Sequence, residues 1–224
     1  MSERADLVLA LRAVLFGRSV SLGWCVPGRA SIDSLGASER LGVSRRRLLE
    51  TAAGRAAARA ALRRAGLPER EIARDRGGAP LWPAGIVGSI THTDGLALAA
   101  VASEEELAAI GIDLERVREL TPAALEHITS SSERARVRAS ADPAGDAIAL
   151  FCAKEAFYKA QYPHTGRVLG FDAVEIVLDP PSARRGFTAR VRVGLDPFPR
   201  GIELRGAAAR AGDHVVAAVA VDRR

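Results

Sequence analysis

The hydrophobic and polar positions follow a helical pattern over residues 45–65, where helix-forming Arg, Ala and Leu predominate. Ser44 precedes this run at an N-cap position, and Gly66 follows it where a helix C-terminus favours glycine. The pattern therefore predicts a long helix over residues 45–65. The Gly- and Pro-rich stretch that follows, through Pro83, predicts an irregular connection across the surface.

Three extended segments are predicted after this connection. Two short apolar runs, beginning at residue 87, flank a turn at residues 93–95 that contains the Asp-Gly pair typical of hairpins. The third segment, residues 109–115, alternates with a period of two. In a strand this spacing places Asp113 and Glu115 on the same face.

The rest of the chain repeats the combination of one long helix with several strands. Residues 132–139 predict a short helix, and residues 146–160 predict a longer one with its N-cap at or near Asp146. Apolar strand patterns then recur over residues 171–178, 187–193, 201–205 and 214–221. We therefore expect an α+β protein with two similar halves, residues 1–106 and 107–224, that join near residues 103–108.

Composition narrows the class of protein. With 224 residues and 48 % hydrophobic positions, the chain can bury a substantial core, which excludes global disorder. Apolar runs are too short for a membrane span, and the N-terminal segment is a poor match to a secretory signal. Cys25 and Cys152 lie far apart, which argues against a zinc ribbon or a disulfide scaffold and favours a reduced cytoplasmic protein.

The charge balance favours an anionic partner. The chain has 32 Lys and Arg residues against 27 Asp and Glu, with a formal net charge of +5. This balance suits nucleic acid, a phosphorylated cofactor or an acidic protein. An aromatic content of 4 % argues against base stacking on single-stranded nucleic acid. The only lysines among the basic residues are Lys154 and Lys159, which stand in one predicted helix.

Three carboxylates are candidates for a cation site. Asp113 and Glu115 project together from a strand, and Glu155 lies between the two lysines of the 146–160 helix. Carboxylate oxygens suit a hard cation that keeps some of its waters for a substrate. Two simpler interpretations remain open: a solvated strand end, and a surface ion pair between Glu155 and Lys159 at i,i+4 spacing.

Basic and hydroxyl side chains supply candidate anion contacts. Arg47, Arg55 and Arg59 recur along one broad side of the 45–65 helix, and Arg74 and Arg76 lie in the Gly/Pro-rich connection. Guanidinium groups bind phosphate through paired hydrogen bonds. A solvated arginine-rich helix is the alternative interpretation.

A further set of candidates ends the strand before the hairpin turn. It comprises two hydroxyls and an imidazole: Ser89, Thr91 and His92. Near a pyrophosphate, the ring N–H of His92 is a useful donor, and the hydroxyls of Ser89 and Thr91 can assist it. Otherwise, His92 is a structural residue of the sheet.

Three motifs, taken together, carry a resemblance to a known family. GSITH at residues 88–92, GIDLE at 111–115 and FCAKEAFYKA at 151–160 resemble, in this order and spacing, the motifs of 4′-phosphopantetheinyl transferases. The similarity is to the Sfp/EntD type, particularly its actinobacterial branch, and runs from about residue 45 to residue 178. The resemblance implies two pseudo-twofold-related halves, each a long helix packed on a small antiparallel sheet, with coenzyme A in the cleft between them.

The resemblance also implies roles for individual residues. The implied Mg²⁺ ligands are Asp113, Glu115 and Glu155. The implied contacts to the coenzyme A pyrophosphate are His92 and Lys154, with Lys159 close by. The implied contacts to the adenosine 3′-phosphate and base are Arg47, Arg55 and either Arg74 or Arg76.

The implied reaction transfers phosphopantetheine from coenzyme A to a serine of an apo carrier protein and releases adenosine 3′,5′-bisphosphate. His92 and Lys154 would stabilise developing charge. The general base stays open between Glu155, acting directly or through water, and neutral Lys154. The expected partner is an acidic helical carrier protein, of unspecified pathway, that serves biosynthesis including secondary metabolism. A monomer is expected, with neither nucleic acid nor membrane as a partner. The alternative is a non-catalytic protein that binds coenzyme A, another nucleotide or nucleic acid.

Overall fold

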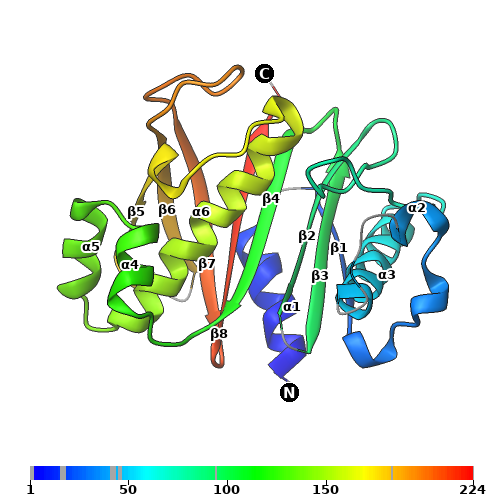
Figure 1. Ribbon diagram of the computed structural model, residues 1–224, viewed down its shortest axis with the longest axis horizontal. Helices are drawn as coiled ribbons and strands as arrows, with labels where there is room; N and C mark the ends of the chain where they lie inside the picture. Colours follow the sequence, from blue (N-terminus) through cyan, green and yellow to red (C-terminus); the bar gives the residue numbers. More distant parts are fainter. Residues whose placement is uncertain are drawn as a thin grey trace.

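Two antiparallel sheets lie side by side, each with one long helix packed on it (Figure 1). The computed structural model describes residues 3–15, 19–40, 44, 47–93, 95–182 and 184–223. Its α-helices are α1 (Glu3–Val14), α2 (Ala37–Arg40), α3 (Leu48–Arg64), α4 (Pro122–Ile128), α5 (Ser131–Arg138) and α6 (Pro143–Thr165). Its strands are β1 (Ser21–Cys25), β2 (Ile86–Thr93), β3 (Leu96–Ser103), β4 (Leu107–Arg116), β5 (Val174–Leu178), β6 (Arg184–Val191), β7 (Glu203–Ala211) and β8 (His214–Asp222).

The first sheet has the strand order β1-β3-β2 and packs on α3. Small residues allow this close approach, because a Cβ added to Gly23 of β1 would lie 2.0 Å from the carbonyl oxygen of Ala57. The facing stripe of α3 is built from fully buried alanines, among them Ala57 and Ala61. Backbone therefore meets backbone where β1 crosses α3.

The second sheet has the order β4-β8-β7-β6-β5 and packs on α6 in the same way. A Cβ added to Gly111 of β4 would lie 1.9 Å from the carbonyl oxygen of Ala156 and 2.7 Å from the amide nitrogen of Ala160. Gly111 and Asp113 share one face of β4. The contact at Gly111 therefore brings Asp113 close to α6.

Strands β2 and β4 connect the two sheets through side chains. The Ser89 Oγ accepts a hydrogen bond of 3.1 Å from the Ile112 amide, and the Thr91 Oγ1 accepts one of 3.2 Å from the Leu114 amide. Both hydroxyl residues are buried. The edge strands are thus joined at the level of the predicted cation site.

Helix α1 contributes to the core shared by both sheets. It packs on β7 and β8 of the second sheet, with smaller contacts to β1. The buried leucines Leu7, Leu11 and Leu15 join an apolar cluster that contains residues of both sheets. Although α1 belongs to the first half in sequence, its main partners are therefore in the second.

The structure confirms the predicted α+β class and most of the elements. The long helix, the hairpin strands, the 109–115 strand and the later strands are all present, with ends shifted by a few residues. Arg45, Arg46 and the turn residue Asp94 lie outside the described residues. The pseudo-twofold relation and the division at residues 106 and 107 stay predictions.

The predicted N-cap of the second long helix is wrong. Helix α6 begins three residues before Asp146, because Asp142 accepts a hydrogen bond of 3.0 Å from the Gly145 amide and Pro143 occupies the first turn. The helix also continues to Thr165. Within the described parts of the chain, no helix combines the length and apolarity that crossing a membrane requires.

Candidate active site

Asp113 is a buried, hydrogen-bonded carboxylate at the junction of the two sheets. Its side chain is buried, and its Oδ1 accepts hydrogen bonds from the Lys159 ammonium at 2.6 Å and from the Thr91 hydroxyl at 3.0 Å. The Lys159 ammonium also donates to the Ile112 carbonyl oxygen at 3.2 Å. Residues from β2, β4 and α6 therefore fix this carboxylate.

Among the described residues, the two oxygens of Asp113 differ in their contacts. The Oδ2 atom is buried and has no hydrogen-bond partner of good geometry among the described residues. The buried Cys152 thiol, whose pKa is raised by burial and further by Asp113, lies beside this carboxylate. A buried carboxylate oxygen without a donor is costly unless a ligand satisfies it. Asp113 therefore has one oxygen held by protein and one available to a cation.

Glu115 and Glu155 are close enough to Asp113 to feel its charge. Burial raises the pKa of Glu115, and the charges of Asp113 and Glu155 raise it further. Burial likewise raises the pKa of Glu155, with a further contribution from Asp113, while Lys159 opposes both shifts. Gathering negative charge in this way favours a bound cation. The sequence-predicted group of carboxylates is thus brought into one neighbourhood.

The three carboxylates do not form a finished coordination shell. Within the described ranges, no three His, Cys, Asp or Glu side chains are arranged so that they could hold a metal ion. The unpaired Asp113 oxygen and the raised pKa values of Glu115 and Glu155 fit a cation, although these side chains are not arranged as a complete ligand set.

A basic pocket opens between α3, β2 and the 74–80 connection. It is lined by Arg47, Glu50, Thr51, Gly54, Arg55, Arg74, Gly78, Pro80, Ile90 and His92. Three of the predicted anion-binding arginines therefore lie around one space, together with His92. Arg74 lines this pocket, whereas Arg76 is exposed and does not.

Arg55 is the buried arginine of this pocket. Burial lowers its pKa to about 10, an effect that the nearby charge of Glu39 opposes. Its guanidinium makes a long contact of 3.5 Å to the Ala73 carbonyl oxygen, and its buried Nε has no partner among the described residues. The side chain thus retains a donor for an anion. Arg59 is instead paired with Glu39 at 2.8 Å.

His92 stands between this basic pocket and the carboxylates. Its Nε2 lies 4.0 Å from a carboxylate oxygen of Glu50. Burial lowers the pKa of His92 and Lys159 acts in the same direction, while Glu50 and Asp113 oppose them. The protonation of the imidazole is therefore influenced by charges of the basic pocket and by the Asp113–Lys159 pair.

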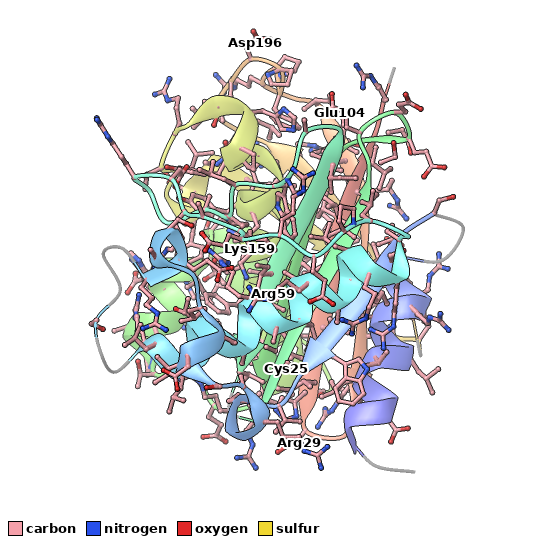
Figure 2. All side chains as sticks on the ribbon, turned by 90° about the vertical axis from the view of Figure 1, so that its right-hand side faces the viewer. Cys25, Arg29, Arg59, Glu104, Lys159 and Asp196 are labelled. Carbon is pink, nitrogen blue, oxygen red and sulfur yellow. The ribbon has the colours of Figure 1, made fainter. Side chains whose placement is uncertain are left out.

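A second pocket adjoins the basic one. Gly78, Pro80 and Ile90 line both, and the second pocket continues to Glu155, Tyr158 and Lys159 of α6. Figure 2 views the molecule from the side of α3 and labels Lys159 close to Arg59 in projection. The two pockets form a groove that leads from the arginines to the charged face of α6.

A third pocket extends the groove beyond Glu155. It shares Glu155 and Tyr158 with the second pocket and is lined by apolar side chains that include Val168, Leu169 and Phe171. The sequence did not point to these apolar positions. Among the residues of this pocket, the sequence indicated the aromatic Tyr158 near Glu155. Residues 168–171 could not be found in this way, because they follow α6 in an irregular segment without hydrophobic periodicity.

The structure does not bring Lys154 to the carboxylate group. Its side chain is 2 % exposed, and its ammonium lies 2.8 Å from a Glu133 carboxylate oxygen and 2.7 Å from the Phe171 carbonyl oxygen. Burial lowers the pKa of Lys154, and Glu133 opposes that shift. The ammonium of Lys154 thus belongs to a buried ion pair with Glu133, while the residue also lines the third pocket beside Glu155. Its expected contact with a pyrophosphate stays a prediction.

The two hydroxyl candidates, Ser89 and Thr91, contact different parts of the site. Ser89 lines the second pocket while its oxygen accepts the Ile112 amide. Thr91 is turned to Asp113 and accepts the Leu114 amide, so it orients the carboxylate. Glu133 was not a candidate from the sequence; the Ser-x-x-Glu spacing that begins at Ser130 marks its helix start but not its partner.

Two family models match most of the chain. The 4′-phosphopantetheinyl transferase N-terminal domain matches residues 40–102, and the 4′-phosphopantetheinyl transferase superfamily matches residues 109–218. The chain is 43 % identical over 183 residues to 4′-phosphopantetheinyl transferase Svp of Streptomyces mobaraensis, covering 79 % of this chain and 73 % of that protein.

Two further relatives match over shorter regions. Identity is 41 % to 4′-phosphopantetheinyl transferase Npt of Nocardia iowensis, covering 54 % of this chain and 55 % of the relative. It is 40 % to 4′-phosphopantetheinyl transferase PptT of Mycobacterium tuberculosis, covering 59 % and 58 %. The regions matched in these two relatives thus span little more than half of their length.

Proposed function

Because the chain belongs to the 4′-phosphopantetheinyl transferase superfamily, and is therefore a transferase, we propose that it moves the phosphopantetheine arm of coenzyme A to a serine of an apo acyl or peptidyl carrier protein. One observation carries the proposal. A groove leads from the arginines of α3 to Glu155, and the Asp113–Lys159 pair stands beside it with one carboxylate oxygen free. This arrangement offers anion contacts and a cation ligand in adjacent places.

The basic pocket would bind the adenosine end of coenzyme A. Arg47, Arg55 and Arg74 line it, and the buried Nε of Arg55 has no partner among the described residues. A phosphate monoester accepts charge-assisted hydrogen bonds from such guanidinium groups. We therefore assign the 3′-phosphate and the base to this pocket, with Arg74 preferred over Arg76.

Asp113, Glu115 and Glu155 would hold Mg²⁺ next to the diphosphate of coenzyme A. The open Oδ2 of Asp113 and the raised pKa values of the two glutamates support this assignment. When bound, Mg²⁺ would neutralise diphosphate charge and leave that group more electrophilic. Oxygen ligands also suit Mn²⁺, so the choice between these two ions is left open.

Lys159 and His92 would donate hydrogen bonds to the diphosphate oxygens. Glu155 would accept the proton of the carrier serine, directly or through one water, as that oxygen attacks the β-phosphorus. A new oxygen–phosphorus bond forms to the serine, the bond to the bridging oxygen breaks, and adenosine 3′,5′-bisphosphate leaves. Lys154 is a poor candidate for this base because its nitrogen is enclosed by Glu133 and Phe171.

The carrier would approach an enzyme of net charge +5, so an acidic helical carrier fits electrostatically and its association should weaken with salt. We also propose that the protein acts as a monomer in the cytoplasm. A single chain supplies all the residues that line the groove, which supports a monomer.

A turnover experiment separates this proposal from a non-catalytic binding protein. The protein is incubated with coenzyme A and an apo carrier, in Mg²⁺ and in excess EDTA, and released adenosine 3′,5′-bisphosphate is measured against modified carrier. The proposal predicts equal amounts of both products in Mg²⁺ and neither in EDTA. Binding of coenzyme A without either product would identify a binder.

A further inference from the structure

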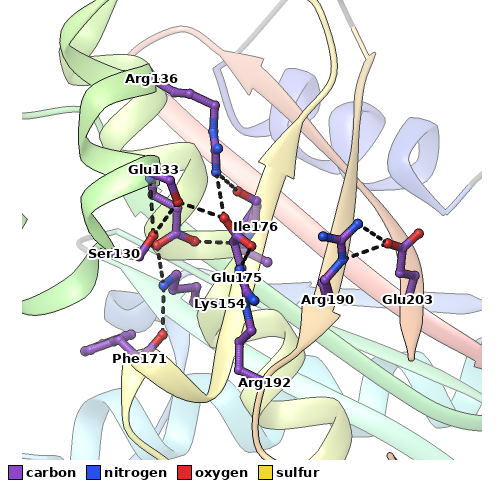
Figure 3. Close-up of polar contacts among 11 residues, drawn as sticks. Ser130, Glu133, Arg136, Lys154, Phe171, Glu175, Ile176, Arg190, Arg192 and Glu203 are labelled. Atoms are coloured by element: carbon purple, nitrogen blue, oxygen red, sulfur yellow. Dashed lines mark hydrogen bonds and ion pairs between the residues drawn. The ribbon is translucent and has the colours of Figure 1, made fainter. Parts of the chain in front are cut away.

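A buried ion pair lies behind the α6 turn that bears Glu155. The Lys154 ammonium is 2.8 Å from the Glu133 carboxylate, and the two side chains are 2 % and 0 % exposed (Figure 3). The same ammonium donates to the Phe171 carbonyl oxygen at 2.7 Å. Lys154 is among the residues that line the pocket of Glu155 and Phe171, but its ammonium is almost fully buried in these contacts.

Glu133 is held by the backbone as well as by Lys154. Its two carboxylate oxygens accept the Ser130 amide at 2.7 Å and the Ile176 amide at 2.7 Å. The pair therefore ties α6 to α5, to β5 and to the segment at Phe171. Phe171 and Glu155 line the same pocket, so the Glu133–Lys154 ion pair and its backbone partners lie next to the proposed site.

The first half of the molecule contains a similar buried glutamate with backbone and cation partners. Glu39 is also fully buried, near the start of the short helix α2. It accepts the Gly36 amide at 2.9 Å, the Ile72 amide at 3.0 Å and the Arg59 guanidinium at 2.8 Å. In both halves a buried glutamate thus joins its own helix start, a later isoleucine amide and a cation of the long helix.

The glycine contacts align the two long helices. Gly23 meets Ala57 and Ala61 of α3, and Gly111 meets Ala156 and Ala160 of α6. Ala57 of α3 therefore corresponds to Ala156 of α6, and Ala61 corresponds to Ala160, with the same difference in residue number for both pairs.

The same offset pairs Arg55 with Lys154, although the cation that contacts Glu39 is Arg59, one helical turn further along α3. It also pairs Ala56 and Ala60 with Glu155 and Lys159. The first half thus keeps a buried glutamate and nearby cations but has alanine at the positions of Glu155 and Lys159. A buried glutamate–cation pair therefore also occurs in the half that has no counterpart of Glu155 and Lys159.

From the contacts of the Glu133–Lys154 pair we propose that Glu133 and Lys154 are positioning residues, which hold the α6 turn so that Glu155 faces Asp113, and that Lys154 does not touch the reacting phosphates. The inference rests on the proposed function for the role of Glu155. It accounts for Lys154 through its observed partners, and it gives a role to Glu133.

The test measures Mn²⁺ affinity by electron paramagnetic resonance, together with kcat and KM for coenzyme A, in Glu133→Gln. Substitution of a residue that orients a metal ligand commonly lowers metal affinity or activity by about 10–100-fold. We expect a fall of that size in Mn²⁺ affinity and kcat, with KM for coenzyme A within about twofold of wild type. Wild-type Mn²⁺ affinity in folded Glu133→Gln would overturn the proposal.

The matched control is Glu203→Gln, which breaks the exposed Arg190–Glu203 pair shown in Figure 3 and should leave all three constants unchanged. A second comparison uses Lys154→Met with and without Glu133→Gln. Positioning predicts that the double variant, which retains no unpaired buried charge, recovers at least several-fold activity over Lys154→Met. Equal activity in the two would instead mean that the lysine acts on substrate.

Mn²⁺ affinity and carrier modification together distinguish a folding defect from failure of the positioning role or of the proposed function. If Glu133→Gln does not fold, the Mn²⁺ affinity of the double variant decides: a loss of about 10–100-fold supports positioning, and wild-type affinity overturns it. A wild-type protein that binds Mn²⁺ but modifies no carrier would refute the proposed function alone, and the affinities would still judge the positioning role. Absence of Mn²⁺ binding by wild type would refute both.

Discussion

At the residue scale, Asp113 has the central position. One of its oxygens is fixed by Lys159 and Thr91, and the other is buried without a donor among the described residues. This asymmetry is what a ligand residue needs, because protein contacts set its orientation while leaving coordination capacity. The sequence showed the residue and its strand, but the difference between its two oxygens depends on side chains that come from β2 and α6.

Asp113→Asn tests that position. Asparagine keeps the shape and a carbonyl acceptor but removes the negative charge, so we expect kcat for carrier modification to fall on the order of 100-fold or more. Steady-state rates at saturating coenzyme A, with a melting curve to verify folding, measure this effect. Glu69→Gln, a change at an exposed ion pair of the surface, is the control. Unchanged kcat in Asp113→Asn would exclude this carboxylate as a ligand.

The arginine assignment is tested by a pair of neighbouring substitutions. Arg74 lines the basic pocket and Arg76 is exposed outside it. Arg74→Ala should raise KM for coenzyme A about 10-fold, since a charge-assisted phosphate contact is lost, whereas Arg76→Ala should not. Dephospho-coenzyme A, which lacks the 3′-phosphate, should show a much smaller effect of Arg74→Ala. The opposite ranking of the two variants would reassign the contact.

At the scale of elements, contacts between glycine and helix backbone set how closely each sheet approaches its helix. Gly111 and Gly23 are neither turn residues nor helix caps, and the sequence pattern alone gave them no role. The local pattern found the strand of Gly111 and the helix opposite it, yet the 1.9 Å clash of an added Cβ follows only from their packing.

Gly111→Ala should therefore push β4 away from α6. Overpacking of this kind costs about 1–3 kcal/mol. For a chain of this size, each kcal/mol lowers Tm by about 2–4 °C. Gly28→Ala is the matched control because an added Cβ there meets nothing within 4 Å. Thermal unfolding of both variants measures the difference, and an equal Tm would contradict the close packing.

Local signals predicted elements better than their ends or their partners. The hairpin strands and the long helices were found because composition and alternation are strong there. The start of α6 was missed because Asp142-Pro143 lies in a polar stretch that resembles a loop. Helix α1, strand β1 and helix α4 were not predicted. The pairing of Lys154 with Glu133 joins residues 21 positions apart, which no helical i,i+4 rule can reveal.

At the scale of the whole molecule, α1 packs against strands of both sheets. Its buried Leu11 is 1 % exposed within a cluster drawn from both sheets, whereas Leu9 on the same helix is 51 % exposed. The N-terminal helix, which belongs to the first predicted half, mainly covers β7 and β8 of the second sheet.

Leu11→Ala should lower the free energy of unfolding by about 2–5 kcal/mol through the cavity it leaves. Leu9→Ala should change it by less than about 0.5 kcal/mol. Denaturant unfolding, followed by circular dichroism and by tryptophan fluorescence, should give a single transition in both variants. Separate transitions for the two probes would show that the halves unfold independently.

The central claim is that this groove transfers phosphopantetheine, and the most direct test is intact mass spectrometry of the acceptor. The wild-type protein and Asp113→Ala are each incubated with coenzyme A, Mg²⁺ and apo carriers from fatty acid, polyketide and nonribosomal peptide synthases. We predict that the wild type adds one phosphopantetheine group to at least one carrier and that Asp113→Ala adds none. Unmodified carriers throughout, despite measurable binding of coenzyme A to the wild type, would contradict the claim.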